Sequence, residues 1–377
     1  MLFDDIERSE LKSDTPSESL FRVMNHYDWP GATRIRNRFE SWFKKFPFAH
    51  QKDLRGRFRS DIDQNHEGAF FELFLHELLT RLGFSLKVHP EITGASTRPD
   101  FLVCHDDQRF YLEATVTGQE AGPFTRNQNE KDVINNLNTL TSPHFYITIH
   151  IEGKLSRTLS KKEVICPFKD LLDAYDPDEV QHLIDERGRN AAPSQKIEFG
   201  DWCLEGWLRP ISPEKRKRDS TRRLILGDNC AAPTDCAGPV RKALQKKAQK
   251  YRNLDAPLVV AVHTRDLFYN GQDHDMEVLF GEGQLLYSKE HPELPSEFDR
   301  KPNGVWSHDS RIDAVLSFQR VDLWNLWHNA SACFYINPHN SNAALPNALF
   351  RLPHSKGYDG EMKRFEGADI GQLVGVD

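Results

Sequence analysis

The sequence lacks the features that mark secreted and membrane proteins. Only six of its 377 residues are cysteines, and no two of them form a CxxC pair. The best apolar run, residues 256–262, is interrupted by Pro257 and is far shorter than the ~20 residues that a helix needs to cross a bilayer. The N-terminal segment MLFDDIERSE is acidic and contains no apolar stretch of the secretory type. We therefore expect a cytoplasmic chain with reduced thiols and no membrane contact.

Several catalytic motifs are also absent. No GxSxG segment marks a nucleophile elbow, and no glycine-rich segment is followed by the GK[ST] of a phosphate-binding loop. Cys230 and Cys236 lie six residues apart without a nearby pair of histidines, so we expect free thiols there and no zinc site. The sequence thus offers no support for a hydrolase triad or a nucleotide-binding loop.

The charge of the chain is unevenly distributed. The whole chain has 49 basic and 56 acidic residues, a formal charge of −7, but residues 31–60 and 205–252 are strongly basic. Either segment alone is typical of a solvated helix face. Together they favour a nucleic-acid partner, because separated charge steers a polyanion even towards an acidic protein. We expect DNA-binding side chains in the second segment at Lys215, Arg216, Lys217, Arg218, Arg222 and Arg223.

The apolar periodicity predicts an α/β protein. The clearest helix covers about residues 65–82, where apolar residues form one wide stripe and Gly83 provides a stop. The expected elements after it are three strands, a helix and a strand, at residues 85–92, 100–104, 110–116, 128–140 and 144–151. We predict a helical N-terminal region (1–60), a core (61–153), a C-terminal elaboration that extends the core (154–352) with an exposed basic insertion near 209–240, and a loosely attached tail (353–377).

Three acidic residues fall where this order of elements could gather them. Asp100 opens one strand of a hairpin and Glu113 lies in the other, so both side chains are expected on one face of the pair. Glu72 lies at the edge of the apolar stripe of the preceding helix, which holds it near the sheet. Carboxylates are ligands that Mg²⁺ and Mn²⁺ favour. The sequence therefore predicts a Mg²⁺ or Mn²⁺ site formed by Glu72, Asp100 and Glu113.

Each carboxylate also has an ordinary structural interpretation. Asp100, directly after a proline, suits a turn. Glu113 could point outward from a half-buried strand, and Glu72 could pair with Arg81 or His76 on its own helix. The metal-site interpretation depends on all three residues occurring together on the expected elements.

In this arrangement the sequence resembles the PD-(D/E)xK nuclease superfamily, which has the restriction-endonuclease-like fold. The resemblance covers about residues 65–151 and is carried by Glu72, Pro99-Asp100 and Glu113-Ala114-Thr115. It implies hydrolysis of phosphodiester bonds in DNA, with the acidic residues holding one or two divalent ions that activate water.

One position departs from the family pattern. Thr115 stands where the motif has lysine, and a hydroxyl group cannot supply a positive charge. Lys131, Arg126 and Lys87 are candidates to replace that lysine, and we favour Lys131 because in this fold the helix after the third strand borders the site. Two other functions stay open, namely an inactive nuclease-like module that binds nucleic acid or a protein, and an interaction protein without a nucleic-acid role. A homodimer is compatible with each of them.

Overall fold

The computed structural model divides the chain into two compact units. The first comprises Met1–Arg8, Met24–Gln119 and Asp235–Asp377, and the second comprises Ser9–Val23 and Glu120–Thr234. The structure describes all residues except 12–17, 93–96, 118–127, 138, 217–224, 227–235, 252–253, 266–268, 270, 287–296, 307–309, 323–325, 327–329, 341–343, 359–360 and 376–377. Within this described part, no helix has both the length and the apolar character that a bilayer crossing requires.

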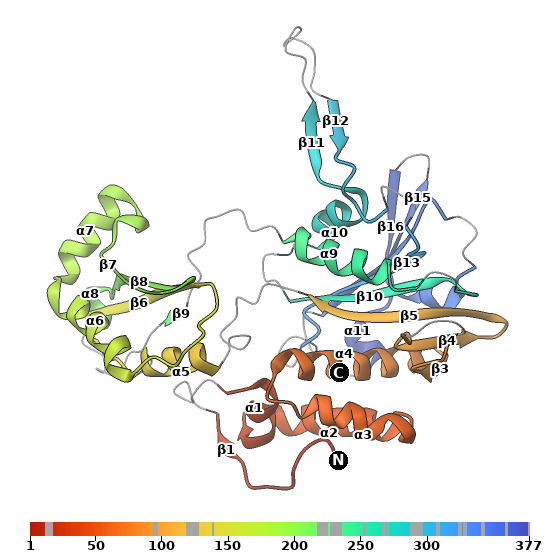
Figure 1. The fold of residues 1–377 in the computed structure, drawn as a ribbon, viewed down its shortest axis with the longest axis horizontal. Coiled ribbons are helices and arrows are strands. Elements are labelled where there is room, and N and C mark those ends of the chain that lie inside the picture. Colours follow the sequence, from red (N-terminus) through yellow and green to blue (C-terminus); the bar gives the residue numbers. More distant parts are fainter. Residues whose placement is uncertain are drawn as a thin grey trace. The chain divides into compact units, whose positions relative to one another are not determined.

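A mixed eight-stranded sheet forms the centre of the first unit (Figure 1). Its strands are β3 (Ser85–Val88), β4 (Phe101–His105), β5 (Gln108–Thr117), β10 (Leu258–Thr264), β13 (Ala314–Gln319), β14 (Ser331–Ile336), β15 (His354–Tyr358) and β16 (Glu361–Phe365). They lie in the order β16-β15-β14-β13-β10-β5-β4-β3. An antiparallel meander joins β3, β4 and β5, and β10 pairs in parallel with both β5 and β13.

Helices cover both faces of this sheet (Figure 1). On one face α4 (Asp63–Arg81) inserts Phe71 and Phe74 against Phe318 of β13, and α2 (Ala32–Lys45) and α3 (Phe48–Phe58) pack on α4. On the other face α9 (Ala237–Ala248) and α10 (Gly271–Phe280) pack in one cluster with alternate residues of β10 and β13. Successive side chains of a strand point to opposite faces, so α4 and α9 lie on opposite sides of the sheet.

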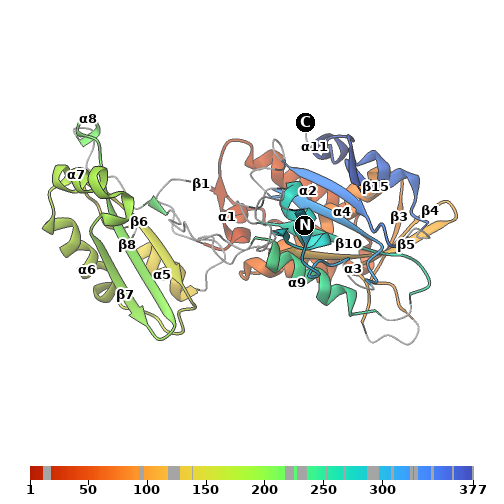
Figure 2. The ribbon, with the colours of Figure 1, turned by 90° about the horizontal axis from the view of Figure 1, so that it is seen from above.

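The second unit has its own core. In the described part its strands are β6 (Phe145–Glu152), β7 (Ser194–Phe199), β8 (Trp202–Pro210) and β9 (Ile225–Leu226), in the order β7-β8-β6-β9. Figure 2 shows β7, β8 and β6 from above. The apolar side chains of β6 and β8 pack against α5 (Gln128–Leu137) and α6 (Lys161–Ala174).

The remaining elements in the described part of the chain are β1 (Ser9–Glu10), α1 (Leu20–His26), β2 (Tyr27–Asp28), α7 (Pro177–Arg187), η1 (Arg189–Ala191), α8 (Pro213–Arg216), β11 (Gly283–Leu286), β12 (Glu297–Arg300), η2 (Asn347–Arg351) and α11 (Ile370–Leu373).

The α/β class is confirmed, as are the first helix and the three strands expected after it. The expected helix at 65–82 is α4, and the three expected strands are β3, β4 and β5. Gly83 follows α4 with a φ of 94°, a left-handed conformation that glycine adopts without strain.

The predicted core boundary at 61–153 is wrong. The expected helix and strand at 128–140 and 144–151 exist as α5 and β6, but they belong to the second unit. In the sheet, β5 lies between β4 and β10, and α9 is the helix that precedes β10 in the sequence. The burial patterns explain the difference. All seven residues of β10 are buried, as in a parallel strand covered on both faces, whereas burial in β6 alternates in part and β6 pairs antiparallel with β8.

The predictions for the C-terminal half also need correction. The region 154–352 is not one elaboration, because residues 154–234 lie in the second unit and the rest lie in the first. Most of the predicted insertion at 209–240 lies outside the described residues. The tail is not loosely attached: β15 and β16 continue the main sheet, and Ile370 and Val374 are buried.

Candidate functional site

The hairpin of β4 and β5 brings Asp100 and Glu113 together. Phe101 pairs with Leu112, so Asp100, one residue earlier, lies beside Glu113 on the adjacent strand. The Asp100 carboxylate accepts a hydrogen bond from the backbone N–H of Ala114, with Oδ2 2.7 Å from the nitrogen. Asp100 thus lies in a bend directly before β4, and its carboxylate reaches across to the backbone of β5.

Glu113 is fully buried and is held by three donors from the α9 region. Lys247 and Tyr251 both donate to its carboxylate, and Lys250 Nζ lies 2.9 Å from Oε1. Burial and the adjacent Glu113 carboxylate raise the pKa of Tyr251 above its ordinary value, so its hydroxyl keeps its proton. The interpretation of Glu113 as an outward-pointing strand residue is wrong.

The pKa of the Asp100 carboxyl group is raised by its surroundings. Burial, followed by the charges of Glu113 and Glu72, raises the pKa of Asp100 to about 7. Lys247 and the hydrogen bond from Ala114 act in the opposite direction without cancelling the rise. Because burial is the largest cause, the shift describes a carboxyl group that is shielded from water and lies close to two other acids.

Glu72 contributes charge to this neighbourhood but has a partner of its own. Arg57 on α3 binds both of its carboxylate oxygens, at 2.6 and 2.7 Å. Neither partner that we considered for Glu72 on its own helix is correct, because Arg81 pairs with Glu77. The charge of Glu72 therefore raises the pKa of Asp100, although both oxygens of Glu72 are bound by the guanidinium group of Arg57.

Thr115 lies on β5 two residues after Glu113, so the two side chains are on the same face of the strand. Lys131, the favoured substitute for the motif lysine, lies on α5 in the second unit, and its side chain is outside the described part, as is Arg126. The cations that do contact the acidic pair are Lys247 and Lys250. The prediction chose the next helix in the sequence, whereas the helix that precedes the next strand of the sheet is α9.

Sequence reasoning could have found α9. It is a basic helix that directly precedes a continuous apolar strand, Leu258–Thr264, and such a strand suits the middle of a parallel sheet better than the partly alternating β6 does. The contacts themselves join residues 134 and 137 positions apart. No local pattern encodes that separation.

The predicted DNA-binding residues do not form a described surface. Arg216 forms hydrogen bonds within its own unit: it donates to the Asp178 carboxylate at 2.7 Å and to the carbonyl oxygen of Ile211 at 2.6 Å. The side chain of Lys215 and the whole of Lys217, Arg218, Arg222 and Arg223 lie outside the described residues.

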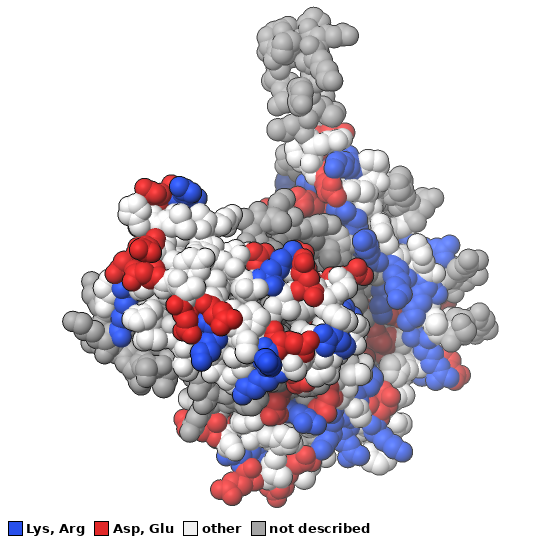
Figure 3. Space-filling view, turned by 60° about the vertical axis from the view of Figure 1, so that its left-hand side comes forward, with Lys and Arg blue, Asp and Glu red and all other residues white. Residues whose placement is uncertain are grey.

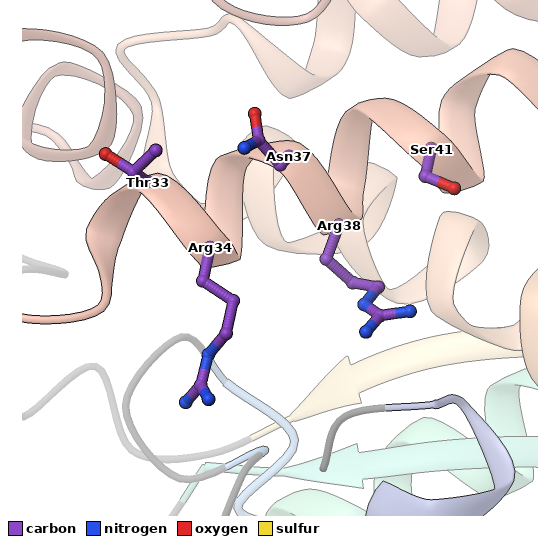
Figure 4. A pocket seen from close by; sticks show the side chains of 5 residues that line it. All are labelled: Thr33, Arg34, Asn37, Arg38 and Ser41. Atoms are coloured by element: carbon purple, nitrogen blue, oxygen red, sulfur yellow. The ribbon is translucent and has the colours of Figure 1, made fainter.

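Basic side chains nevertheless gather elsewhere. Figure 3 shows lysine and arginine collected in one area at the right of that view, whereas elsewhere on this face the two signs are interspersed. On α2 a shallow pocket of about 460 Å³ is lined by Thr33, Arg34, Asn37, Arg38 and Ser41, with no acidic residue among them (Figure 4). Because α2 packs on α4, this pocket lies across the sheet from α9 and Glu113.

The predicted metal site is only partly assembled. Among the described residues, no three aspartate, glutamate, histidine or cysteine side chains converge as a ready metal centre. Asp100 and Glu113 do lie together, and their hard oxygen atoms suit Mg²⁺ or Mn²⁺. Proteins usually hold Mg²⁺ through one or two carboxylates supplemented by water and substrate phosphate.

Comparison with known proteins adds no assignment, since no protein-family model, no curated protein and no solved structure matches the chain.

Proposed function

We propose that the chain is a metal-dependent endonuclease that hydrolyses phosphodiester bonds in DNA and is a divergent relative of the PD-(D/E)xK superfamily. The observation that carries this proposal is that Asp100, directly before β4, lies beside Glu113 of β5, and that Lys247 is bound to Glu113. Two carboxylates and a cation at one point are the groups that such hydrolysis needs.

The topology of the first unit supports the proposal. Omitting residues 120–234, which belong to the other unit, leaves the order α4, β3, β4, β5, α9, β10. This is the succession of helix, three strands, helix and strand that the resemblance implies. The second unit then corresponds to an insertion between the third strand and the second helix of the core.

Each residue near Glu113 has a defined role in this proposal. Asp100 and Glu113 would hold Mg²⁺ or Mn²⁺, which when bound lowers the pKa of water and stabilises negative charge on phosphate. Lys247 supplies the positive charge that Thr115 lacks, and its bond to Glu113 keeps its ammonium group beside the acidic pair. The neutral Tyr251 hydroxyl fixes the orientation of the Glu113 carboxylate.

The charges of the site are balanced before substrate binds. Three carboxylates (Glu72, Asp100 and Glu113) face three cations (Arg57, Lys247 and Lys250). The raised pKa of Asp100 means that near pH 7 a proton already offsets part of the negative charge. A phosphodiester group adds a further negative charge, which a divalent ion can neutralise.

One observation favours the alternative of an inactive module that binds nucleic acid. Glu72 and Glu113 are already neutralised by Arg57, Lys247 and Lys250, and Thr115 departs from the motif. A site that is satisfied by its own cations has less need of a metal ion.

Cleavage assays separate the two functions. Plasmid, linear duplex, single-stranded DNA and RNA are incubated with the protein in Mg²⁺, Mn²⁺ or EDTA, together with Asp100→Asn, Glu113→Gln and a control, Glu205→Gln, on β8 of the other unit. The endonuclease proposal predicts metal-dependent cleavage by the unmodified protein and by the control, and loss of cleavage in both site variants. Binding without cleavage in either metal would instead establish the inactive module.

A further inference from the structure

The exposed face of α9 has a composition unlike that of the other helices near the site. Between Ala237 and Lys250 the segment contains no acidic residue. Val240 and Leu244 are buried in the core cluster and fix the rotation of the helix. The outward face then consists of glutamines and lysines: Lys242, Gln245, Lys246, Gln249 and Lys250.

Three of these lysines form one stripe along the helix. Lys242, Lys246 and Lys250 are four residues apart, so they lie on the same side of the helix about 6 Å apart along its axis. The C-cap residue Gln249 keeps helical backbone angles, and the N–H of Lys250 bonds to the carbonyl of Lys247, so the stripe continues to Lys250. Its C-terminal end is the amine that contacts Glu113.

The two N-terminal lysines of the stripe have no acidic partner in the described part of the chain. Lys242 and Lys246 are exposed, and neither forms an ion pair or hydrogen bond with another residue in the part of the chain that the structure describes. Like charges four residues apart on a helix cost stability. Three of them without an intervening acid attract a polyanion and are typical of a surface that binds phosphates.

We propose that the α9 stripe binds the sugar-phosphate backbone of a nucleic-acid strand and leads it to the Asp100–Glu113 pair. The inference rests on the proposed function for the identity of the ligand. It adds the path of the strand, which runs along α9 and away from the α2 pocket on the other side of the sheet. Lys250 ends this path by pairing with Glu113, where a phosphate reaching the site meets both Lys250 and Lys247.

Binding measured in EDTA tests the stripe independently of hydrolysis. Fluorescence anisotropy with a labelled 25-nucleotide DNA, single-stranded and duplex, compares the unmodified protein with Lys242→Gln/Lys246→Gln over a series of salt concentrations. We expect about tenfold weaker binding at low salt. The slope of log K against log salt concentration should fall by roughly 1.4 to 1.8, because two phosphate contacts are lost.

Two control variants make the result specific. Arg34→Gln/Arg38→Gln removes two cations from the α2 pocket and should change the affinity less than twofold. Lys242→Arg/Lys246→Arg keeps the charge and should bind like the unmodified protein. Equal affinity and an equal salt slope in Lys242→Gln/Lys246→Gln, or no DNA binding by the unmodified protein at low salt, would overturn the inference.

The inference and the proposed hydrolysis fail in different ways. If the unmodified protein never cleaves but its DNA binding depends on the stripe, the inference stands and the endonuclease proposal falls. If it cleaves and the Lys242→Gln/Lys246→Gln variant cleaves with an unchanged KM, the stripe is not the path of the strand although hydrolysis is real.

Discussion

Two fully buried glutamates in the first unit have the same kind of surroundings and different consequences. Glu77 on α4 binds Lys45 and Arg81, and Glu113 on β5 binds Lys247 and Lys250. Glu113 differs in having a second acid beside it, Asp100, whose pKa is raised to about 7 by burial and by the charges of Glu113 and Glu72. Glu77 is therefore part of a buried ion pair alone, whereas Glu113 is part of a buried ion pair beside a second acid with a raised pKa, a combination that is common at functional sites.

The largest difference between the two glutamates should appear in catalysis. In the proposed function Asp100 and Glu113 hold the metal ion, so Asp100→Asn and Glu113→Gln should each lower metal-dependent cleavage by about 100-fold or more. Glu77→Gln should leave kcat per folded molecule unchanged. Initial rates of plasmid nicking, normalised to the folded fraction from circular dichroism, make the comparison. A comparable loss in Glu77→Gln would show that the two glutamates do not differ in function.

The lysines that bind the two glutamates should differ in the same direction. Lys247→Met should lower kcat by about 100-fold, since in the proposed function Lys247 supplies the positive charge of the motif lysine. Lys45→Met, the corresponding change at Glu77, should leave kcat unaltered. Introducing Thr115→Lys into the Lys247→Met variant should restore part of the activity. Single-turnover rates measure these effects, and full activity in Lys247→Met would refute the assignment of Lys247.

The raised pKa of Asp100 predicts a pH dependence confined to the Glu113 region. Below pH 7 a proton competes with the divalent ion, so Mn²⁺ affinity should fall up to about tenfold per pH unit. Without metal, the folded state binds this proton more tightly than the unfolded state, whose carboxyl has a pKa near 3.8. The resulting stabilisation is complete below about pH 4 and is lost as the pH rises to about 7.

Calorimetric titration of Mn²⁺ and thermal unfolding between pH 4 and pH 8 measure the two effects. Asp100→Asn should abolish both of them, and Glu77→Gln should preserve both. An Mn²⁺ affinity that does not change with pH in the unmodified protein would contradict a protonated Asp100.

The two substitutions should rank in the opposite order for their effect on stability, and this difference should be smaller than the difference in catalysis. Glu77→Gln should lower the free energy of unfolding by about 1–2 kcal/mol, because two charge-assisted bonds are lost while both cations remain partly exposed. Glu113→Gln should cost less, since relief of repulsion with Asp100 offsets part of the loss. Urea unfolding in EDTA at pH 7.5 measures both values, and a larger loss in Glu113→Gln would contradict this ranking.

The parts of this arrangement that sequence could predict are local. The apolar stripe of α4 and the polar turn between β4 and β5 are encoded within about twenty residues each, and they suffice to place Asp100 beside Glu113. The partner of β5 in the sheet is not local, because residues 120–234 fold as part of another unit before the chain returns through α9.

Two further features depend on contacts between distant segments. Glu72 has several cations within reach in the sequence, and only the packing of α3 on α4 selects Arg57. The strands β15 and β16 have weak patterns of their own and are stabilised by pairing at the edge of an existing sheet. Periodicity within one segment identifies neither contact.

The central claim is that Asp100 and Glu113 together hold a hard divalent cation. Crystals soaked in Mn²⁺ and measured at a wavelength where manganese scatters anomalously test it most directly. We expect a single strong anomalous peak about 2 Å from oxygen atoms of both carboxylates, which disappears in Asp100→Asn. A structure at high Mn²⁺ with no peak there, and with Lys247 and Lys250 still bound to Glu113, would contradict it.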